Sequence, residues 1–304
     1  ISKTPIIRPD GSVFQEDGYD PETRYYVHLG GEEWPKVPES PTAANVDKAR
    51  DRLLDVVSDF PFESESGKAA WLAAILTVVG RSCFEGTAPM FVIDANIRGT
   101  GKTLLVDAAA LIALGQELPK MPYTQCDEET RKAITSHMIK ANPAVLLDNI
   151  AEPLGTPSLD AALTGSVWGD RILGKNEQKE FPNKTTWFAT GNNIRYKGDT
   201  VRRVLHIRLD SPDEFPEKRH EFKHKDLRGF VREHRRELFA DAMTILRGYF
   251  AAGKPVKQVS HFGSFEDWSR IIRQAVLFVR LPDPCETRKS IEEGADADRL
   301  FLKA

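Results

Sequence analysis

The stretch that decides the fold is MFVIDANIRGTGKTLLVDAAALIAL, residues 90–114. It opens with a short apolar run, passes through a loop with two glycines, and ends in an apolar helical pattern that Gly115 closes. The loop, NIRGTGKT at 96–103, ends in the glycine, lysine and threonine arrangement G-x-G-K-T. This arrangement is typical of a phosphate-binding loop (P-loop), which lies between a strand and a helix. The sequence therefore predicts a strand, a P-loop and a helix in this order.

The loop residues have defined expected roles. Backbone N–H groups of 99–102 would surround phosphate groups at the helix N-terminus, Lys102 would reach the outer phosphates, and Thr103 would bind Mg²⁺. Asn96 replaces the first glycine of the usual pattern, and asparagine tolerates left-handed backbone conformations. A glycine-rich turn with a surface lysine is the alternative, but it does not account for the flanking strand and helix. The candidate nucleotide-binding residues are Asn96, Gly99, Thr100, Gly101, Lys102 and Thr103.

The hydrophobic pattern along the chain predicts an α/β fold. Strands are expected at 90–94, 121–124, 144–148, 185–190 and 204–209, and helices at 45–60, 66–79, 103–114, 128–140, 158–168, 227–252 and 265–279. Short apolar strands separated by helices indicate a parallel sheet covered on both faces. The expected parts are an N-terminal extension (1–42) with a short hairpin at 25–29, a helical segment (43–87), an ATPase core (88–211) and a helical lid (212–304).

Composition narrows the class of protein. The chain has 304 residues, 40% of them hydrophobic and 29% charged, which is typical of a soluble globular protein. Its longest apolar run, 69–79, is shorter than the roughly 20 residues that cross a membrane, so no span is predicted. The net charge of -3 provides no global attraction to nucleic acid, so any DNA contact requires a local cluster.

Cysteine usage and the start of the chain give two further expectations. The three cysteines have neither CxxC spacing nor a cysteine–histidine pairing, which argues against a disulfide framework and a structural zinc site and fits a reducing cytoplasm. The chain begins with isoleucine and lacks a signal-peptide pattern, so we expect it to be part of a longer protein.

A second acidic position follows the P-loop. A P-loop enzyme needs an acidic residue at the end of a neighbouring strand to hold its metal, and AVLLD at 144–148 provides Asp148. The next residue is Asn149, where many ATPases carry a glutamate that polarises the attacking water. Because asparagine is not a base, either another carboxylate serves or hydrolysis is slow. The candidate carboxylates are Glu128, Glu129 and Glu152.

Two polar motifs follow the acidic strand. FATGNN at 188–193 places the amide of Asn192, or alternatively of Asn193, where it could orient water or contact the γ-phosphate. GDTVRR at 198–203 places Arg202 and Arg203 before the last strand. A planar guanidinium suits a phosphate on a neighbouring subunit, and the alternative is a pair of solvated surface arginines.

In this order, the motifs resemble the ATPase portion of phage, plasmid and genomic-island primase-helicases, which belong to the AAA+ and superfamily 3 helicase-like P-loop proteins. The resemblance runs from about Pro5 to about Arg299 and is carried by TPIIRPDG, GYD, DFPF, NIRGTGKT, LLDN, ATGNN, GDTVRR and SFEDWSRIIRQA. It implies an AAA+ sheet with a helical lid, ATP and Mg²⁺ bound between subunits of a ring, expected to be a hexamer, DNA as partner, and an upstream primase domain.

The resemblance also implies residue roles. These are Asn192 as the sensor-1 residue with Asn193 as the fallback, Arg203 or Arg202 as the arginine finger, and Arg270 or Arg273 as the sensor-2 candidate. RILGKNEQKEFP at 171–182 has apolar flanks around a polar tip, which indicates a β-hairpin. In related helicases a hairpin here lines the central channel, so Lys175 and Lys179 are implied contacts to DNA phosphates. A solvated hairpin tip is the alternative.

The sequence thus predicts an ATP-dependent DNA helicase or translocase motor of a mobile-element replication protein. The main alternative is an ATP-switched DNA-binding or loader module with weak hydrolysis, which Asn149 favours. A small-molecule kinase is a third reading, but such an enzyme needs neither the sensor asparagine nor the paired arginines.

Overall fold

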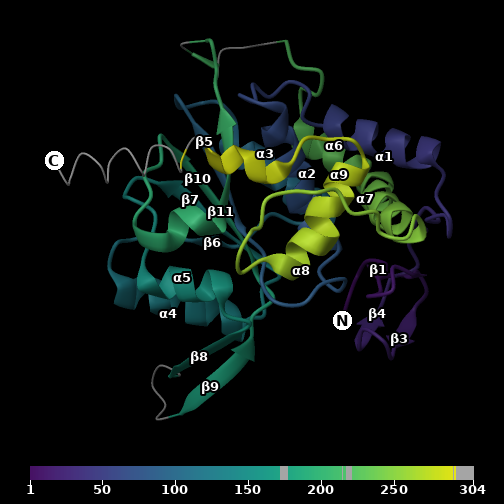
Figure 1. Cartoon of the computed structure of the whole chain (residues 1–304), viewed down its shortest axis with the longest axis horizontal. Coiled ribbons are helices and arrows are strands. Elements are labelled where there is room, and N and C mark those ends of the chain that lie inside the picture. The colour runs from purple at the N-terminus through teal and green to yellow at the C-terminus, as the bar shows by residue number, and fades with distance from the viewer. Residues whose placement is uncertain (172–176, 214, 217–220, 290, 292–304) are drawn as a thin grey trace.

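A five-stranded parallel sheet forms the centre of the computed structural model, which describes residues 1–171, 177–213, 215–216, 221–289 and 291 (Figure 1). The strand order is β11-β5-β10-β7-β6, so the P-loop strand β5 lies between β11 and β10. The strands are β5 (Met90–Ala95), β6 (Lys120–Met121), β7 (Ala144–Ile150), β10 (Thr186–Asn192) and β11 (Val204–Leu209). The predicted α/β fold is confirmed.

Helices cover both faces of the sheet because successive strand residues point to opposite sides. Phe91 and Ile93 of β5 pack with α2 (Glu65–Val79) and α3 (Lys102–Leu114). Met90 and Val92 belong to the other core, with α4 (Asp127–Ile139) and α5 (Pro157–Thr164). Burial of both faces explains why the strands read as continuous apolar runs.

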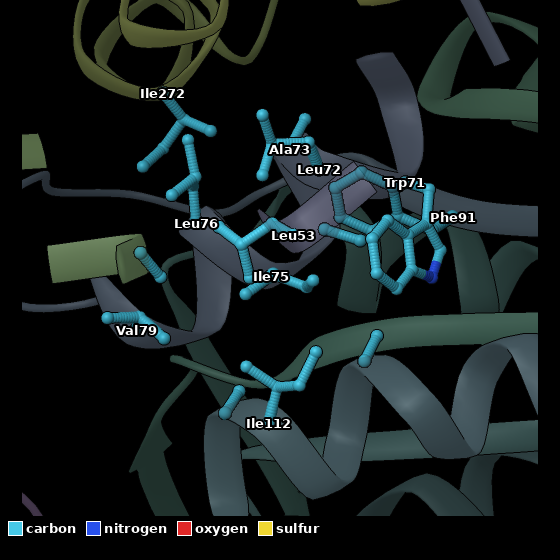
Figure 2. Close-up of a cluster of buried hydrophobic side chains, with 14 of the residues drawn as sticks. Leu53, Trp71, Leu72, Ala73, Ile75, Leu76, Val79, Phe91, Ile112 and Ile272 are labelled. Atoms are coloured by element: carbon cyan, nitrogen blue, oxygen red, sulfur yellow. The ribbon is translucent and has the colours of Figure 1, made fainter. Parts of the chain in front are cut away.

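The first core extends into a second layer of helices. These are α1 (Ala43–Asp55), α6 (Leu227–Glu233), α7 (Arg235–Ala251), α8 (Glu266–Trp268) and α9 (Gln274–Phe278), with a π-helical turn at Ser269–Arg273 between the last two. Figure 2 shows side chains from distant segments in this core, including Leu53, Trp71 and Ile272. The helices after residue 226 therefore share one core with α1, α2 and α3.

Three small hairpins complete the described structure. The N-terminal region forms β1 (Ile6–Ile7) with β2 (Val13–Phe14), and β3 (Gly18–Asp20) with β4 (Tyr25–Val27). The hairpin expected at 25–29 is therefore present, but its strands begin at Gly18. The third hairpin, β8 (Val167–Arg171) with β9 (Gln178–Pro182), extends away from the sheet (Figure 1).

Four predicted elements differ from the structure. The helix expected at 45–60 is α1, which begins at Ala43 and ends at Asp55. The helix expected at 158–168 ends at Thr164, and Trp168 instead lies in β8, where its indole N–H donates to Thr135 Oγ1 at 3.0 Å. The helix expected at 227–252 is divided at His234 into α6 and α7. The strand expected at 121–124 is limited to Lys120–Met121, because it pairs only with β7 at the sheet edge.

Candidate nucleotide-binding site

The site lies at the carboxyl edge of the sheet. Parallel strands bring their carboxyl ends to one edge, and the register places Asn192 beside Ala95 and Leu209 beside Ala95 on the other side. The polar residues at or next to these ends are Asp94, Asp148, Asn192 and Arg208. The P-loop follows β5 directly and leads into α3 at Lys102, so it lies at this same edge.

The loop has the backbone that phosphate binding requires. Gly99 and Gly101 have φ values of 80° and 84°, the left-handed region that glycine adopts without strain. Gly101 is also the residue before α3 and provides no side-chain cap to the helix. A Cβ at Gly101 would lie 3.0 Å from Phe60 Cε1. The first turn of α3 therefore presents its N–H groups, at the positive end of the helix dipole, without a competing side chain.

Lys102 and Asn192 are in direct contact, although 90 residues separate them. Lys102 Nζ donates to Asn192 Oδ1 at 2.7 Å. Burial lowers the pKa of Lys102, and the nearby carboxylate of Asp94 acts against this shift. The structure thus brings the predicted phosphate lysine and the predicted sensor asparagine together.

Asp148 and Thr103, the two predicted metal residues, are also in contact. Thr103 Oγ1 donates to Asp148 Oδ1 at 3.1 Å, and Thr190 Oγ1 donates to the same oxygen at 2.7 Å. Burial would raise the pKa of Asp148, but hydrogen bonds from Lys120 and Thr190 outweigh it, so the pKa is lowered. A carboxylate and a hydroxyl are suitable Mg²⁺ ligands when substrate phosphates and water complete the shell.

Lys120 is a residue of this site that the sequence analysis missed. Its ammonium lies 2.6 Å from Asp148 Oδ2, so it places a positive charge at the predicted metal ligand. The hydrogen bond to Asp148 raises the pKa of Lys120. A lysine at the start of a two-residue strand belongs to no motif, so no sequence signal pointed to it.

A second missed group surrounds Asp94, the buried acidic residue of β5, two positions before the P-loop. Its Oδ1 accepts from the Ile194 N–H at 3.2 Å, and its Oδ2 lies 3.1 Å from His206 Nε2 and 2.6 Å from Arg208 Nη1. Burial would raise the pKa of Asp94, but the contact with His206 and the positive charges outweigh it, so the pKa is lowered. This carboxylate is therefore ionised within the protein.

The asparagine turn after β10 links this group to the P-loop. Asn193 has a left-handed φ of 50°. Its Oδ1 accepts from Arg208 Nη2 at 2.8 Å, and its Nδ2 donates to the backbone oxygen of Asn96 at 3.2 Å. Asn96 in turn donates through its side chain to Ser211 O at 2.9 Å. Asn96 and Asn193 therefore fix the loop from both sides.

Asn149, which stands where many ATPases have a catalytic glutamate, and the three candidate carboxylates are all exposed. Asn149 is exposed, has a φ of 57°, and uses its backbone N–H to donate to Thr190 Oγ1 at 2.9 Å. Glu128 and Glu129 each lie 2.9 Å from Lys132 Nζ, and Glu152 accepts from the Gln125 N–H at 2.7 Å. The structure does not select one of the three carboxylates as the base.

A cavity of about 460 Å³ adjoins the P-loop. This volume is within the range of small-molecule sites. The lining is mostly apolar and includes Val56, Phe60, Pro61, Gly101, Leu104 and Pro212.

The predicted finger arginines differ from one another. Both belong to the 3₁₀ helix Gly198–Arg203. Arg203 forms an ion pair with Asp160 of α5 at 2.7 Å. Arg202 is exposed, and its side chain has no ion pair or hydrogen bond with any residue that the structure describes.

The segment between the asparagine turn and this 3₁₀ helix is itself fixed to the loop after β7. The Leu154 N–H donates to Arg195 O at 2.7 Å, and the Lys197 N–H donates to Leu154 O at 2.9 Å. Tyr196 packs edge-on against His206, with 5.8 Å between the ring centroids.

The two sensor-2 candidates have partners within their own region. Arg270 is exposed and contacts Asp267 at 2.9 Å. Arg273 is 1% exposed, donates to Asp283 Oδ1 at 2.7 Å, and donates to Ser260 O at 2.7 Å. With so little exposed surface, Arg273 cannot contact a nucleotide in this conformation. Its contacts instead join the π-helical turn to the neighbouring loops.

Of the two predicted DNA contacts, the structure describes Lys179, which lies on the hairpin. Lys179 is half exposed on β9 and lies 3.4 Å from Glu177. Lys175 lies outside the described residues. Asp170 of β8 is buried and forms an ion pair with Arg131 of α4 at 3.1 Å, which fixes the base of the hairpin to the helix.

Within the described part of the chain, no helix is long and apolar enough to cross a membrane, and no three His, Cys, Asp or Glu side chains gather as a metal site. A magnesium ion would therefore rely on one carboxylate, a hydroxyl and the phosphates.

No protein-family model and no curated protein matches the chain. Among solved structures, the apo A form of the NrS-1 C-terminal region matches with a TM-score of 0.47 and 14% identity, over 90% of this chain and 60% of that chain. Another structure of that region matches with a TM-score of 0.37 and 12% identity, over 74% and 53%. The JCV helicase in complex with an acetamide compound matches with a TM-score of 0.32 and 11% identity, over 67% and 61%. The chain is thus similar in part to these structures and spans less than two thirds of each.

Proposed function

We propose that the chain is an ATP-dependent motor that acts on DNA, with ATP bound at the P-loop and Mg²⁺ held by Thr103 and Asp148. The observation that carries the proposal is a pair of contacts, Lys102 to Asn192 and Thr103 to Asp148, which join β7, α3 and β10 at one edge. A structural surface turn would need neither contact. A phosphate site needs both, because the lysine and the metal ligand must face the same phosphates.

The residues divide the chemistry between them. The N–H groups of the loop and the ammonium of Lys102 would bind the phosphates, and Asp148, ionised at neutral pH, would hold the metal together with Thr103. Bound Mg²⁺ would neutralise charge that develops on the phosphate oxygens. When Lys102 turns to a phosphate, the Asn192 amide is released from it and can orient the attacking water.

The apolar cavity beside the loop is suited to the nucleobase. It adjoins Gly101, where the phosphates would begin, and Phe60 and Pro61 offer flat apolar surface to an aromatic ring. The dominance of apolar lining indicates that stacking and shape, more than hydrogen bonds, would hold the base.

A ring assembly is the part of the proposal that Arg202 supports. Arg202 comes just before β11, whose first residue, Val204, pairs with Met90, so it lies toward the amino edge of the sheet, opposite the P-loop of its own chain. Its side chain is exposed and is unpartnered in the described structure, so a phosphate on a neighbouring subunit is a suitable partner. Arg203 is instead engaged by Asp160. We therefore propose Arg202 as the arginine finger of a ring, with Arg203 holding its 3₁₀ helix in place.

The alternative is a nucleotide-switched DNA-binding module with weak hydrolysis. It is favoured by Asn149, because the residue after the metal aspartate cannot act as a base, and by the three exposed glutamates, none of which contacts Asp148. ATP binding and ring formation would be the same in both cases, and only turnover would differ.

One experiment tests the proposal and separates these two readings. ATP turnover is measured with and without single-stranded DNA, alongside binding of a non-hydrolysable ATP analogue. A motor shows turnover that DNA stimulates, and a switch binds the analogue but turns over slowly in both conditions. A chain that does not bind the analogue contradicts both.

The role of Arg202 is tested by mixing subunits. An Arg202→Ala subunit mixed with a Lys102→Ala subunit should recover activity, because some interfaces combine an intact loop with an intact arginine. The matched control is a mixture of two Lys102→Ala preparations, which contains no intact loop. No recovery in rings shown to be mixed contradicts a finger role in trans.

A further inference from the structure

We propose that Arg208 is a positioning residue of the phosphate site: it holds the asparagine turn at 192–194 against the P-loop by joining Asp94 to Asn193. The proposal rests on the proposed nucleotide site for its kinetic consequences. Its structural part rests on contacts that exist without a nucleotide.

Asp94 is buried beside the proposed phosphate site. A carboxylate buried next to a triphosphate site repels the phosphates and loses its hydration, so an ionised group is tolerated there only with several partners. Asp94 has three, namely the Ile194 N–H, His206 and Arg208. Asp94 therefore holds other groups in position at the end of β5 and does not itself contact the phosphates.

Arg208 lies between two partners. Its Nη1 donates to Asp94 at 2.6 Å and its Nη2 donates to Asn193 at 2.8 Å, so one planar guanidinium spans both. Lysine offers a point charge and cannot make this bridge with fixed geometry. Asn193 adopts a left-handed φ, which the two side-chain contacts to Arg208 and Asn96 help to maintain.

The fixed turn also limits the movement of Asn192. The residue that contacts Lys102 is the immediate neighbour of Asn193, so a turn that is fixed at Asn193 and Ile194 leaves Asn192 little freedom. When a phosphate takes the place of Asn192 at the ammonium, the amide would remain aimed at the same region. Arg208 thus acts through Asn193 and Asp94 on the orientation of Asn192.

The expected defect is in turnover and not in binding. Lys102 and the loop N–H groups supply the binding interactions, whereas misplacing an orienting group by a small distance lowers the rate. We expect Arg208→Lys to lower kcat by about 10-fold or more, with the Kd for a non-hydrolysable ATP analogue within about threefold of the parent value.

The test uses four variants of the chain. Arg208→Lys keeps the charge beside Asp94, Asn193→Ala removes the other end of the bridge, and the third variant combines the two. Arg52→Lys is the matched control, because Arg52 also pairs with a buried aspartate, Asp241, but in the α1–α7 interface. Arg208→Ala is avoided, because it would leave Asp94 without its arginine and could prevent folding. Thermal melting confirms that each variant is folded.

The outcomes distinguish the inference from the proposed function. Support requires that both single variants lose turnover but not analogue binding, and that the combined variant is no slower than the worse single one, because the two residues act as a unit. Unchanged turnover in Arg208→Lys, or multiplied losses in the combined variant, overturns the inference while the parent still binds and hydrolyses ATP. A parent protein that fails to bind the analogue overturns the proposed function, and a thermal double-mutant cycle that shows no coupling between Arg208 and Asn193 then overturns the bridge itself.

Discussion

The pKa values of two buried aspartates, each paired with an arginine, are shifted in opposite directions. Asp94, at the carboxyl edge of the sheet, has its pKa lowered, whereas burial raises the pKa of Asp241, between α1 and α7, to about 6. Both side chains are at least nine-tenths buried. The difference lies in their partners: Asp94 has three on its two oxygens, and Asp241 has Arg52 on one oxygen, while its Oδ2 has no hydrogen-bond partner in the described structure.

The comparison shows that burial alone does not decide the charge of a carboxylate. The cost of removing an ion from water is offset only when enough donors surround it, and such donors are available where several strands end together. At the sheet edge the polar groups are organised toward one another and toward a ligand. At the helical interface Asp241 has one arginine partner, and the charges of Lys48 and Glu237 shift its pKa in opposite directions.

The largest expected effect is a loss of ATP turnover without a loss of stability, which distinguishes ligand binding from folding at the sheet edge. Lys102→Ala should lower ATP turnover by roughly 100-fold or more, because the outer phosphates lose their ammonium partner. The melting temperature should change little, because burial disfavours the charged form of Lys102 in the folded protein. Lys140→Ala, at the exposed end of α4, is the control. Turnover equal to that of the parent would remove the basis for the phosphate site.

The second prediction concerns the helical interface and pH. Asp241 binds a proton more tightly in the folded chain, with a pKa of about 6 against an ordinary value of 3.8, so its contribution to stability decreases as pH rises from about 4 to 6. Asp241→Asn removes this dependence. The free energy of unfolding of the variant, minus that of the parent, should therefore increase over this range, by at most about 3 kcal/mol.

Denaturant titrations at several pH values measure this difference, with ATP turnover at neutral pH as a second readout that should not change. A difference that is constant from pH 4 to 7 would show that Asp241 is not protonated preferentially in the folded state. A loss of turnover would show that the helical interface is not separate from the site.

A smaller effect is expected within the sheet edge, at the metal ligand. Lys120→Met removes the ammonium that contacts Asp148, so the metal no longer competes with Lys120 for the carboxylate. Because Lys120 is half exposed, the pair is worth at most about 1 kcal/mol, and the affinity for Mn²⁺, measured by electron paramagnetic resonance with bound nucleotide, should rise no more than about fivefold. Lys132→Met, which removes a pair with Glu128 and Glu129, is the control. Weaker Mn²⁺ binding in Lys120→Met would show that the lysine supports the metal site instead.

The smallest effect is expected on the hairpin, which belongs to neither region. Lys179→Ala should flatten the dependence of DNA affinity on salt by about 0.7 to 0.9 in log–log slope, the value for one phosphate contact. Lys175→Ala should add a similar change if both lysines bind DNA, and basal ATP turnover should persist. An unchanged salt slope in the double variant would direct attention to residues 218–236, a stretch with eight lysines and arginines against three acidic residues.

The sequence predicted the parts of the site that have local motifs. The strand, the glycines and Lys102 follow one another within a few residues, so their arrangement is visible from spacing alone. Asp148 and Asn192 were predicted because each ends an apolar strand, and the parallel sheet then brings them to one edge.

Pairing between distant residues could not be predicted in the same way. Asp94 and Arg208 are single charges in apolar strands, and only the adjacency of β5 and β11 shows that they meet. The prediction places Trp168 at the end of a helix, whereas the pairing of β8 with β9 determines its conformation. Lys120 has no motif at all, and only the β6–β7 pairing places it next to Asp148.

The segment between Asn192 and Arg202 has a mechanical consequence. It is fixed at one end by Asp94 and Arg208, in the middle by Leu154 and His206, and at the other end by the ion pair of Arg203 with Asp160. These anchors belong to β5, β11, α5 and the loop after β7, so the segment is held as part of these elements and does not move by itself. In the proposed ring, the phosphate side of one site and the exposed arginine would therefore shift together with these elements and not independently.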